Sequence, residues 1–590
     1  MISTPFLDTH SVSKFSQINI DFNPIYQSLT IHRADVIRGR KVIPRLPGAE
    51  IRTINREKRL DDMIYEGILT ASVILKDIRK GDVIDFAYTI KGRNPILGKK
   101  FDSFFNMGWL TDIDKARIRI NIPKSRTLRY RTILSDIKPV ISLKGNIRTY
   151  EWLMANPPPA KYEYNTPSWI VQSPMLQVSE YKNWKEVAGW ALELFSAGRL
   201  PDSLRPLTDR WKKQSRSKQL LSALDFVQDE IRYLGMEIGE NSHKPHKPLE
   251  VLRNRYGDCK DKALFLSVLL GSLKYKATPV LVSATNRKAI GRWLPGTQMF
   301  DHVIVKIETD EGIFWVDPTI TDQAGGLRHR YISKYGYGLV IDRGQKKLVK
   351  IPDNSQKNII KMVESYDIKK REDPVILKVH TDYFGPVGDS RKRELKNWKK
   401  SGVKDKYYSY YKELYEKVNP EFQFKVLRNK NAPAIKTREQ YKIEDPWVES
   451  DDHLSLKTYA EVMYSYISDR PNKDRTKPFL IYHPVKIHYR GEISLPKGSV
   501  VDLYDLRVEI KNSLHHYKRK ITRDGDKVYI DHYYRSKKAF VKPEQITQYI
   551  NDSKRIEKSL TYWIPLQKTS YIRLKTRMDN LRDLLKDDEM

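Results

Sequence analysis

The sequence predicts a multidomain α+β protein, with a β-sandwich at the N-terminus, an α+β core in the middle and a β-rich domain at the C-terminus. A chain of 590 residues is too long for one hydrophobic core, so three or four domains are expected. Short runs with apolar residues at every second position dominate both ends of the chain, which is typical of β-strands. Longer runs with helical spacing occur in the middle, where strand-like runs follow them.

Residues 1–160 are expected to form the β-sandwich. Ile18, Ile20 and Phe22 alternate with polar neighbours, as in a strand with one buried face. Lys80-Gly81-Asp82 is a turn signal between two further strand-like runs. Many short strands without long helical patterns are typical of a sandwich. A proline-rich run near residue 160 marks the end of this domain.

Residues 175–345 are expected to form the α+β core. Three runs have apolar residues at helical spacing, and three strand-like runs follow the last of them. Helices followed by an antiparallel sheet make an α+β domain. The expected helices are Trp184–Phe195, Ser217–Tyr233 and Cys259–Gly271, and the expected strands are Thr278–Ser283, His302–Glu308 and Ile313–Val316.

Residues 360–590 return to strand-like patterns and are expected to form the C-terminal β-rich domain. The turn signal Asp524-Gly525 precedes one of these strands. Pro543 suits the first turn of a late helix. Basic residues from Arg391 to Lys400 and the tyrosines that follow resemble either a nucleic-acid surface or a basic amphipathic helix, and we favour the helix.

The formal net charge is +34. Such an excess attracts polyanions such as nucleic acid, anionic lipid or acidic polysaccharide. Because the basic residues are spread along the whole chain, a well-solvated surface is favoured. Polyanion contact through this basic surface remains an open expectation.

Targeting signals are sparse. The opening residues Met1–His10 lack the apolar segment of a secretory signal, so the chain as written is expected in the cytoplasm. If a signal sequence upstream of Met1 is missing, a periplasmic or exported protein is expected instead. The most apolar stretch, Ala263–Leu270, is too short to cross a bilayer, so no transmembrane segment is expected.

Cys259 is the single cysteine, which excludes internal disulfides and multi-cysteine metal sites. It follows Asp258, a good N-cap for the predicted helix. Unpaired N–H groups and the positive helix dipole in the first turn stabilise a thiolate, and Lys260 and Lys262 are expected to add positive potential. A lone thiol is more often a buried small hydrophobe, but this context favours a nucleophile.

His302 opens one predicted strand, and Asp317 ends the next. Turn-forming residues lie between these strands. If the hairpin loop has an even number of residues, such as two or four, His302 and Asp317 point to the same face. The carboxylate can then orient the imidazole as the base for Cys259. Each residue alone has an ordinary explanation, but a helix-N-terminal cysteine, a strand histidine and a next-strand aspartate in this order are specific.

These residues resemble the core of the transglutaminase-like superfamily, which has a papain-like α+β fold. The resemblance is closest to bacterial proteins that carry a DUF3857 domain before that core. It implies a catalytic triad of Cys259, His302 and Asp317. The matching runs are Arg255–Ala263, Asp301–Val303, Trp315–Pro318, Phe226–Gly235, the Pro-His-Lys-Pro run at Pro245, Gly81–Ile84 and Asn94-Pro95.

The implied reaction is thiol-dependent acyl transfer on protein or peptide amides through a thioester. Resolution by an amine would make a transglutaminase, and resolution by water a cysteine protease or amidase. A non-enzymatic polyanion-binding or envelope scaffold protein is the third alternative. The chemistry needs no metal and no organic cofactor.

Other residues are candidates for further roles in the site. The Cys259 N–H is the expected first oxyanion donor, and Gln228 is a candidate second donor, although a glutamine on an amphipathic helix is more often solvated. His243 and His246 lack nearby carboxylate or cysteine partners in sequence, which disfavours a metal site. Trp293 and Met299 are candidates to line the cleft, with packing favoured for both.

Overall fold

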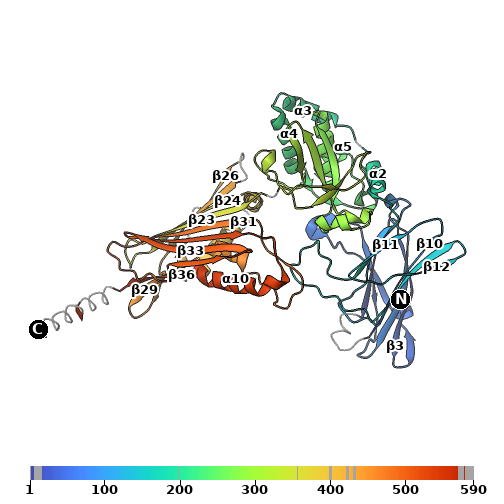
Figure 1. The fold of residues 1–590 in the computed structure, drawn as a ribbon, viewed down its shortest axis with the longest axis horizontal. Helices are drawn as coiled ribbons and strands as arrows, with labels where there is room; N and C mark the ends of the chain where they lie inside the picture. Colours follow the sequence, from blue (N-terminus) through green and yellow to red (C-terminus); the bar gives the residue numbers. More distant parts are fainter. Residues whose placement is uncertain are drawn as a thin grey trace. The chain divides into compact units, whose positions relative to one another are not determined.

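The computed structural model describes residues 2–5, 16–196, 198–354, 356–397, 402–419, 424–429, 434–568 and 577–578. The chain forms two compact units. Unit 1 holds Met1–Pro158, Pro174–Ile320 and Tyr335–Ile351, and unit 2 holds the remaining segments Pro159–Ser173, Thr321–Lys334 and Pro352–Met590. The chain therefore passes between the units five times. The prediction of a multidomain α+β protein is confirmed (Figure 1).

The first part of unit 1 contains four antiparallel sheets, ordered β1-β8-β3-β4, β2-β7-β5, β10-β13-β12 and β11-β14-β9, and the short strand β6, which pairs in parallel with β16 (Gly235–Met236). The first two sheets share one apolar core, and the last two share another. The strands are β1 (Ile2–Pro5), β2 (Gln17–Phe22), β3 (Ser28–Arg38), β4 (Lys41–Pro44), β5 (Glu50–Asn55), β6 (Ile64–Tyr65), β7 (Leu69–Ile74), β8 (Val83–Lys91), β9 (Asp102–Asn106), β10 (Lys115–Pro123), β11 (Arg129–Ile133), β12 (Val140–Lys144), β13 (Ile147–Ala155) and β14 (Met175–Ser179).

The turn at Lys80-Gly81-Asp82 does join two strands, β7 and β8, but these lie in different sheets. Asp82 is 1% exposed and accepts hydrogen bonds from Nε and Nη2 of Arg38 on β3, at 2.9 and 2.8 Å. This ion pair, buried on its Asp82 side, holds the turn against a strand of the sheet that β8 joins. The connection therefore crosses between two layers that share a core.

The second part of unit 1 is built on a five-stranded antiparallel sheet in the order β20-β19-β18-β21-β22. Helix α6 packs against β18 and β19. The elements of this second part are α2 (Trp184–Leu194), α3 (Arg205–Lys212), α4 (Arg216–Asp225), β15 (Arg232–Tyr233), β16 (Gly235–Met236), α5 (Pro248–Asn254), β17 (Tyr256–Gly257), α6 (Cys259–Ser272), β18 (Lys276–Val282), β19 (His302–Thr309), β20 (Gly312–Val316), β21 (Tyr337–Val340) and β22 (Val349–Lys350).

One predicted helix ends earlier than expected. Helix α4 continues as a π-helical turn, Phe226–Glu230, and the chain then enters β15 instead of remaining helical to Tyr233. Strand β15 pairs in parallel with β17, directly before Cys259. A pairing with residues more than twenty positions away is not visible in the local helical pattern.

Unit 2 contains a nine-stranded sheet in the order β25-β27-β24-β23-β31-β34-β33-β32, with β26 also paired to β27. Helix α10 packs on this sheet through Ile556 and Leu560 (Figure 1). The elements are β23 (Asn358–Asp367), β24 (Val375–Phe384), α7 (Pro386–Glu394), α8 (Val403–Leu414), β25 (Val418–Asn419), β26 (Lys425–Asn429), β27 (Ala434–Ile443), β28 (Trp447–Glu449), β29 (His453–Tyr459), α9 (Glu461–Ile467), β30 (Phe479–Leu480), β31 (Val485–Ser494), β32 (Arg507–Lys511), β33 (His515–Asp524), β34 (Lys527–Ser536), β35 (Phe540–Val541), α10 (Ile546–Leu560) and β36 (Thr561–Gln567).

The core of unit 2 encloses a buried carboxyl group. Glu364 is fully buried and accepts hydrogen bonds from the hydroxyls of Tyr366 (2.8 Å), Tyr411 (2.6 Å) and Tyr489 (2.7 Å). Burial raises the pKa of Glu364, and the three hydroxyls oppose that rise. Tyr411 comes from α8, so this tyrosine-rich helix packs into the core. Residues 398–401 of the preceding basic run lie outside the described residues.

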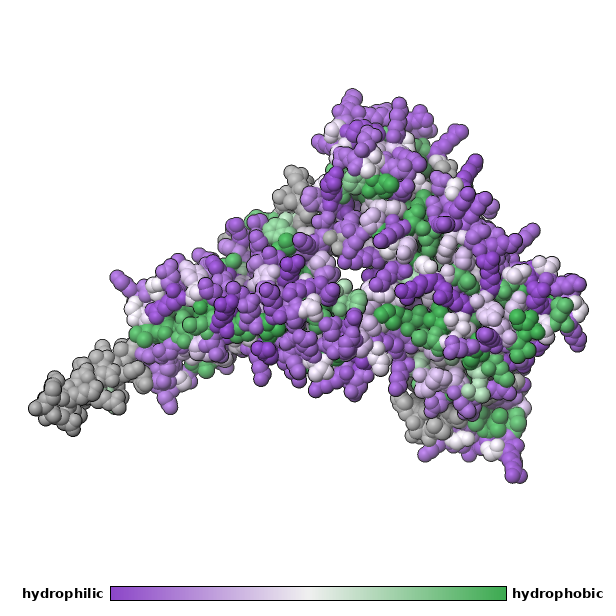
Figure 2. All heavy atoms as spheres, viewed as in Figure 1, coloured by the Kyte–Doolittle hydropathy of each residue, from purple (hydrophilic) through white to green (hydrophobic). Residues whose placement is uncertain are grey.

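Hydrophilic side chains cover most of the visible surface of each unit in Figure 2. Within the described ranges, no helix combines the length and apolar character needed to cross a bilayer.

Candidate active site

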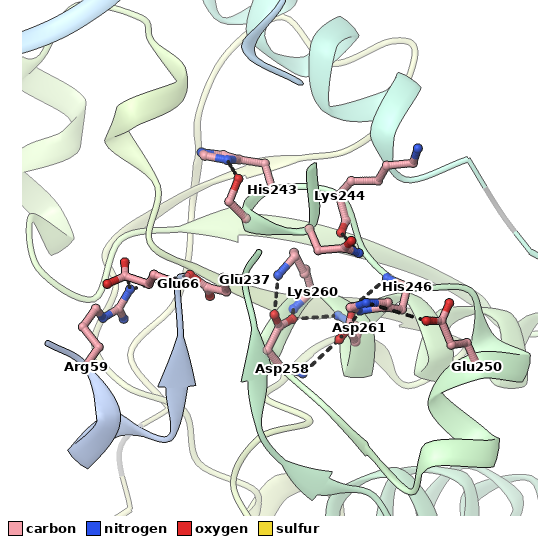
Figure 3. Close-up of polar contacts among 12 residues, drawn as sticks. Arg59, Glu66, Glu237, His243, Lys244, His246, Glu250, Asp258, Lys260 and Asp261 are labelled. Carbon is pink, nitrogen blue, oxygen red and sulfur yellow. Dashed lines mark hydrogen bonds and ion pairs between the residues drawn. The ribbon is translucent and has the colours of Figure 1, made fainter. Parts of the chain in front are cut away.

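Cys259 occupies the first position of helix α6, and a capping box fixes the start of that helix. The Asp258 carboxylate accepts hydrogen bonds from the N–H groups of Lys260 and Asp261, at 3.1 and 3.2 Å. The Asp261 carboxylate accepts one from the Asp258 N–H at 3.1 Å (Figure 3). Cys259 is 7% exposed. The thiol is thus held at the positive end of the helix dipole, as predicted.

The two lysines beside Cys259 do not face solvent as free positive charges. The Lys260 ammonium forms an ion pair with Asp258 inside the cap (Figure 3). The Lys262 ammonium donates to the main-chain carbonyls of Gln228 (3.2 Å) and Ile231 (2.6 Å), and burial lowers its pKa to about 8. Both lysines are buried with their own partners, and the Lys260 ammonium also interacts electrostatically with Cys259, in the direction that was predicted.

His302 and Asp317 lie together on one face of the β19–β20 hairpin. Thr309 pairs with Gly312, so the loop has two residues, an even number as required. Asp317 follows β20 at the position across from Ile304, and its side chain reaches diagonally to His302. The distance from His302 Nε2 to Asp317 Oδ2 is 2.8 Å.

Four donors surround the Asp317 carboxylate, which is 3% exposed. Oδ2 accepts from His302 and from the Tyr335 hydroxyl at 3.1 Å. Oδ1 accepts from the Thr319 N–H at 2.9 Å and the Thr319 hydroxyl at 2.6 Å. Burial alone would raise the pKa of Asp317, but the charge and hydrogen bond of His302 and the bonds from Thr319 hold it below its usual range.

His302 is linked electrostatically to both other members of the predicted triad. Burial lowers the pKa of His302, but the Asp317 charge and hydrogen bonds to Asp317 and Cys259 outweigh that effect and hold the pKa well above its usual range. Since Nε2 bonds to Asp317, Nδ1 is the nitrogen left to take the thiol proton.

Tyr335 and Thr319 are residues that the sequence reasoning missed. The Tyr335 ring stacks on His302, with ring centroids 5.8 Å apart, and its hydroxyl reaches Asp317. Thr319 forms an Asx-type turn with Asp317, and the Asp-Pro-Thr run is a local signal that could have indicated this. Tyr335 gives no such signal, because the intervening segment belongs to unit 2.

Gln228 is fully buried, contrary to the expectation of a solvated glutamine. It lies in the π-helical turn, and its side-chain amide donates to the Asp317 main-chain carbonyl at 2.8 Å. That bond uses an amide hydrogen to hold the end of β20. The geometry makes Gln228 a support for the Asp317 backbone.

The two loop histidines lie near α6 but bond to different partners. His246 bonds through Nδ1 to the Asp261 carboxylate at 3.1 Å (Figure 3). It also borders a cavity of ≈ 320 Å³. His243 bonds to Ser242, and burial lowers its pKa to about 4. Among the residues described, no group of three or more His, Cys, Asp or Glu side chains is placed to hold a metal ion.

The comparisons with known proteins agree with this architecture. Residues 6–161 match the DUF3857 family, described as "Domain of Unknown Function with solved-structure structure", so the chain contains a DUF3857 domain. No curated protein matches the chain.

Among solved structures, a crystal structure of a "putative protease" from Parabacteroides distasonis ATCC 8503 matches with a TM-score of 0.64 at 14% identity. The match covers 95% of this chain and 94% of that one, which shows a shared fold along nearly the whole length. A "putative cysteine protease" from Cytophaga hutchinsonii matches with a TM-score of 0.18 at 11% identity, over 51% of this chain and 79% of that one.

Proposed function

We propose that this protein is a cysteine-dependent enzyme of the transglutaminase-like type that cleaves or transfers amide-linked acyl groups of proteins or peptides. One observation carries the proposal. His302 is hydrogen-bonded to Asp317 at 2.8 Å, and the interaction of its imidazole with Asp317 and with the thiol of Cys259, which begins helix α6, holds the pKa of His302 well above its usual range. A buried thiol that merely fills space needs neither an imidazole partner nor a carboxylate behind that imidazole.

In the first half-reaction, the Cys259 thiolate attacks the amide carbonyl carbon, and the main-chain N–H of Cys259 donates to the developing oxyanion. The C–N bond then breaks. The leaving amine takes the proton from the His302 imidazolium, and a thioester remains on Cys259.

In the second half-reaction, neutral His302 removes a proton from the acceptor, which attacks the thioester carbonyl. The C–S bond breaks, and the thiolate–imidazolium pair is restored. Asp317 stays ionised throughout and holds the His302 ring. An amine acceptor gives a transferase, and a water acceptor gives a peptidase or amidase.

The description of the Parabacteroides structure as a "putative protease" favours water as the acceptor. The motif around Cys259, His302 and Asp317 supports a catalytic core of the transglutaminase-like type, and this core fits either acceptor. Both outcomes belong to the same proposal, because they differ only in the molecule that resolves the thioester.

Mass spectrometry of a protein library, incubated with and without a labelled primary amine, tests the proposal. We expect products that depend on Cys259 and disappear in Cys259→Ser and His302→Ala. New peptide termini would identify a peptidase, and amine adducts on glutamine a transglutaminase. If the wild-type protein yields neither product, and Cys259 reacts with iodoacetamide no faster than a model thiol near about pH 6.5, the proposal fails.

A further inference from the structure

Two segments, one beside the strand that precedes Cys259 and one that leads into His302, are both held by strands of the DUF3857 domain or of its sheets. Residues 232–234 bond to β17 (Tyr256–Gly257), which lies just before Cys259, and residues 235–237 bond to β6 and its neighbour Met63. Residues 293–298 come shortly before His302. Each segment makes hydrogen bonds to residues far away in the sequence, within unit 1.

The segment before His302 is held by Asp102 at the start of β9. Asp102 is 9% exposed. Its Oδ1 accepts from the Thr297 hydroxyl at 2.9 Å, and its Oδ2 accepts from the Gln298 N–H at 2.9 Å. A Cβ on Gly296 would lie 2.6 Å from Asp102 Oδ2, so the loop approaches the carboxylate as closely as glycine allows.

A second attachment fixes the same segment. Gln177 on β14, the strand paired with β9, is 1% exposed. Its amide donates to the Leu294 carbonyl at 2.9 Å and accepts from the Leu294 N–H at 2.8 Å. Phe104 on β9 packs edge-on against Trp293, with ring centroids 5.2 Å apart. The loop thus rests on the β11-β14-β9 sheet immediately before it enters β19.

The segment beside Cys259 is held by β6. This strand pairs in parallel with β16. The Gly235 N–H donates to the Met63 carbonyl at 2.9 Å, and the Glu237 N–H donates to the Tyr65 carbonyl at 2.8 Å. Figure 3 shows Arg59 of the DUF3857 domain beside Glu66 and Glu237, with an Arg59–Glu237 distance of 3.7 Å.

We infer that the DUF3857 domain is an integral part of the candidate active site. The domain sets the distance between Cys259 and His302 because it holds both segments. Asp102 is the residue of this domain that positions His302. The inference rests on the proposed function. A misplacement of about 1 Å between reacting groups can slow a reaction on the order of a hundredfold, so two attachments on separate segments have a direct chemical effect.

The test is the pH profile of Cys259 alkylation by iodoacetamide in the full chain. Asp102→Ala removes both acceptors, whereas Asp102→Asn keeps an acceptor for the Gln298 N–H and a group that can bond to the Thr297 hydroxyl. Asp82→Ala is the matched control. Asp82 is also a buried carboxylate of the DUF3857 domain, but it bonds to Arg38 and Arg79.

In the wild-type protein, we expect fast alkylation near about pH 6.5 that depends on His302. Asp102→Ala should slow it roughly tenfold or more at that pH and leave alkylation near about pH 9.5 unchanged, where the thiol ionises without a base. Asp102→Asn should restore most of the rate. Asp82→Ala should lower thermal stability without changing the profile.

Each other outcome is decisive. If the wild type shows fast, His302-dependent alkylation and Asp102→Ala keeps it, the inference is wrong while the proposed function stands. Equal changes in Asp82→Ala and Asp102→Ala would show general destabilisation and also overturn it. A wild type without fast alkylation would overturn the inference, and the product assay would then decide the proposed function separately. If Asp102→Ala fails to fold, Thr297→Val removes one donor to Asp102, with Thr297→Ser as its conservative control, and the same comparison applies.

Discussion

Replacement of Asp317 by asparagine is expected to disable His302 as a base while leaving the fold intact. The carboxylate accepts four hydrogen bonds, and an asparagine can present only one oxygen. The Thr319 N–H can only donate, so it will take that oxygen. The amide nitrogen then faces His302 Nε2 and forces the imidazole proton onto Nδ1, which is the nitrogen that must accept the thiol proton.

The magnitude follows from the distances. With charge centres about 4 Å apart and an effective dielectric constant of about 20, the lost attraction between Asp317 and an imidazolium is about 4 kcal/mol. Such a loss corresponds to roughly a thousandfold in turnover. The effect on the alkylation rate has a smaller maximum than the effect on turnover, because a thiol with a pKa of about 8.5 is still about 1% ionised near pH 6.5. Alkylation of Asp317→Asn near that pH should therefore slow by at most about a hundredfold.

The assay is Cys259 alkylation by iodoacetamide, followed by mass spectrometry across the pH range. Asp301→Asn is the matched control, since Asp301 directly precedes His302 but accepts from the N–H groups of Ala284 and Thr285. We expect a wild-type profile for the control and a profile shifted to alkaline pH for Asp317→Asn. An unshifted profile for Asp317→Asn would show that the carboxylate does not govern the His302 proton.

Three further changes probe other parts of the structure. His246→Gln should lower the melting temperature mainly below about pH 6.5, because the hydrogen bond to Asp261 raises the pKa of His246. The stabilisation from this raised pKa is lost as the pH rises through the pKa of His246 in the folded protein. A loss of melting temperature that grows toward alkaline pH would contradict this. Gly257→Ala should lower the free energy of unfolding, measured in urea, by roughly 1–3 kcal/mol and should slow Cys259 alkylation, since the new Cβ would lie 2.8 Å from Asp261 Cβ in the capping box. An unchanged free energy of unfolding would show that the cap can adjust. Glu364→Ala should destabilise unit 2 by about 3 kcal/mol or more, because three buried hydroxyls lose their acceptor, and should leave Cys259 alkylation unchanged; a parallel loss of alkylation would refute the separation of the two units.

Local rules predicted the elements that carry the candidate triad. Asp258 is a capping residue followed by apolar helix formers, and the observed α6 begins at Cys259 as expected. Turn residues between two apolar strands predicted the β19–β20 hairpin, and its two-residue loop places His302 and Asp317 on one face. Both features depend on neighbouring residues alone, which makes them readable from sequence.

Long-range contacts account for what the sequence did not predict. Tyr335 reaches Asp317 after an excursion of the chain into unit 2, and no spacing rule describes such a return. The buried Lys262 ammonium bonds to the carbonyls of Gln228 and Ile231, which are 34 and 31 positions away in the sequence. Strand β14 completes the sheet of β9 and β11 from residues 175–179, beyond the proline-rich run. Each depends on which distant segments meet, and local composition does not encode that.

The repeated passage of the chain between the two units has a practical consequence. Asp317 and Tyr335 belong to unit 1, but residues 321–334 between them fold with unit 2, as do residues 159–173. A deletion that starts at residue 352 would strip these two segments of the body on which they fold. Each unit consists of three separate segments of the chain, so neither unit can be removed or exchanged as one continuous stretch of sequence.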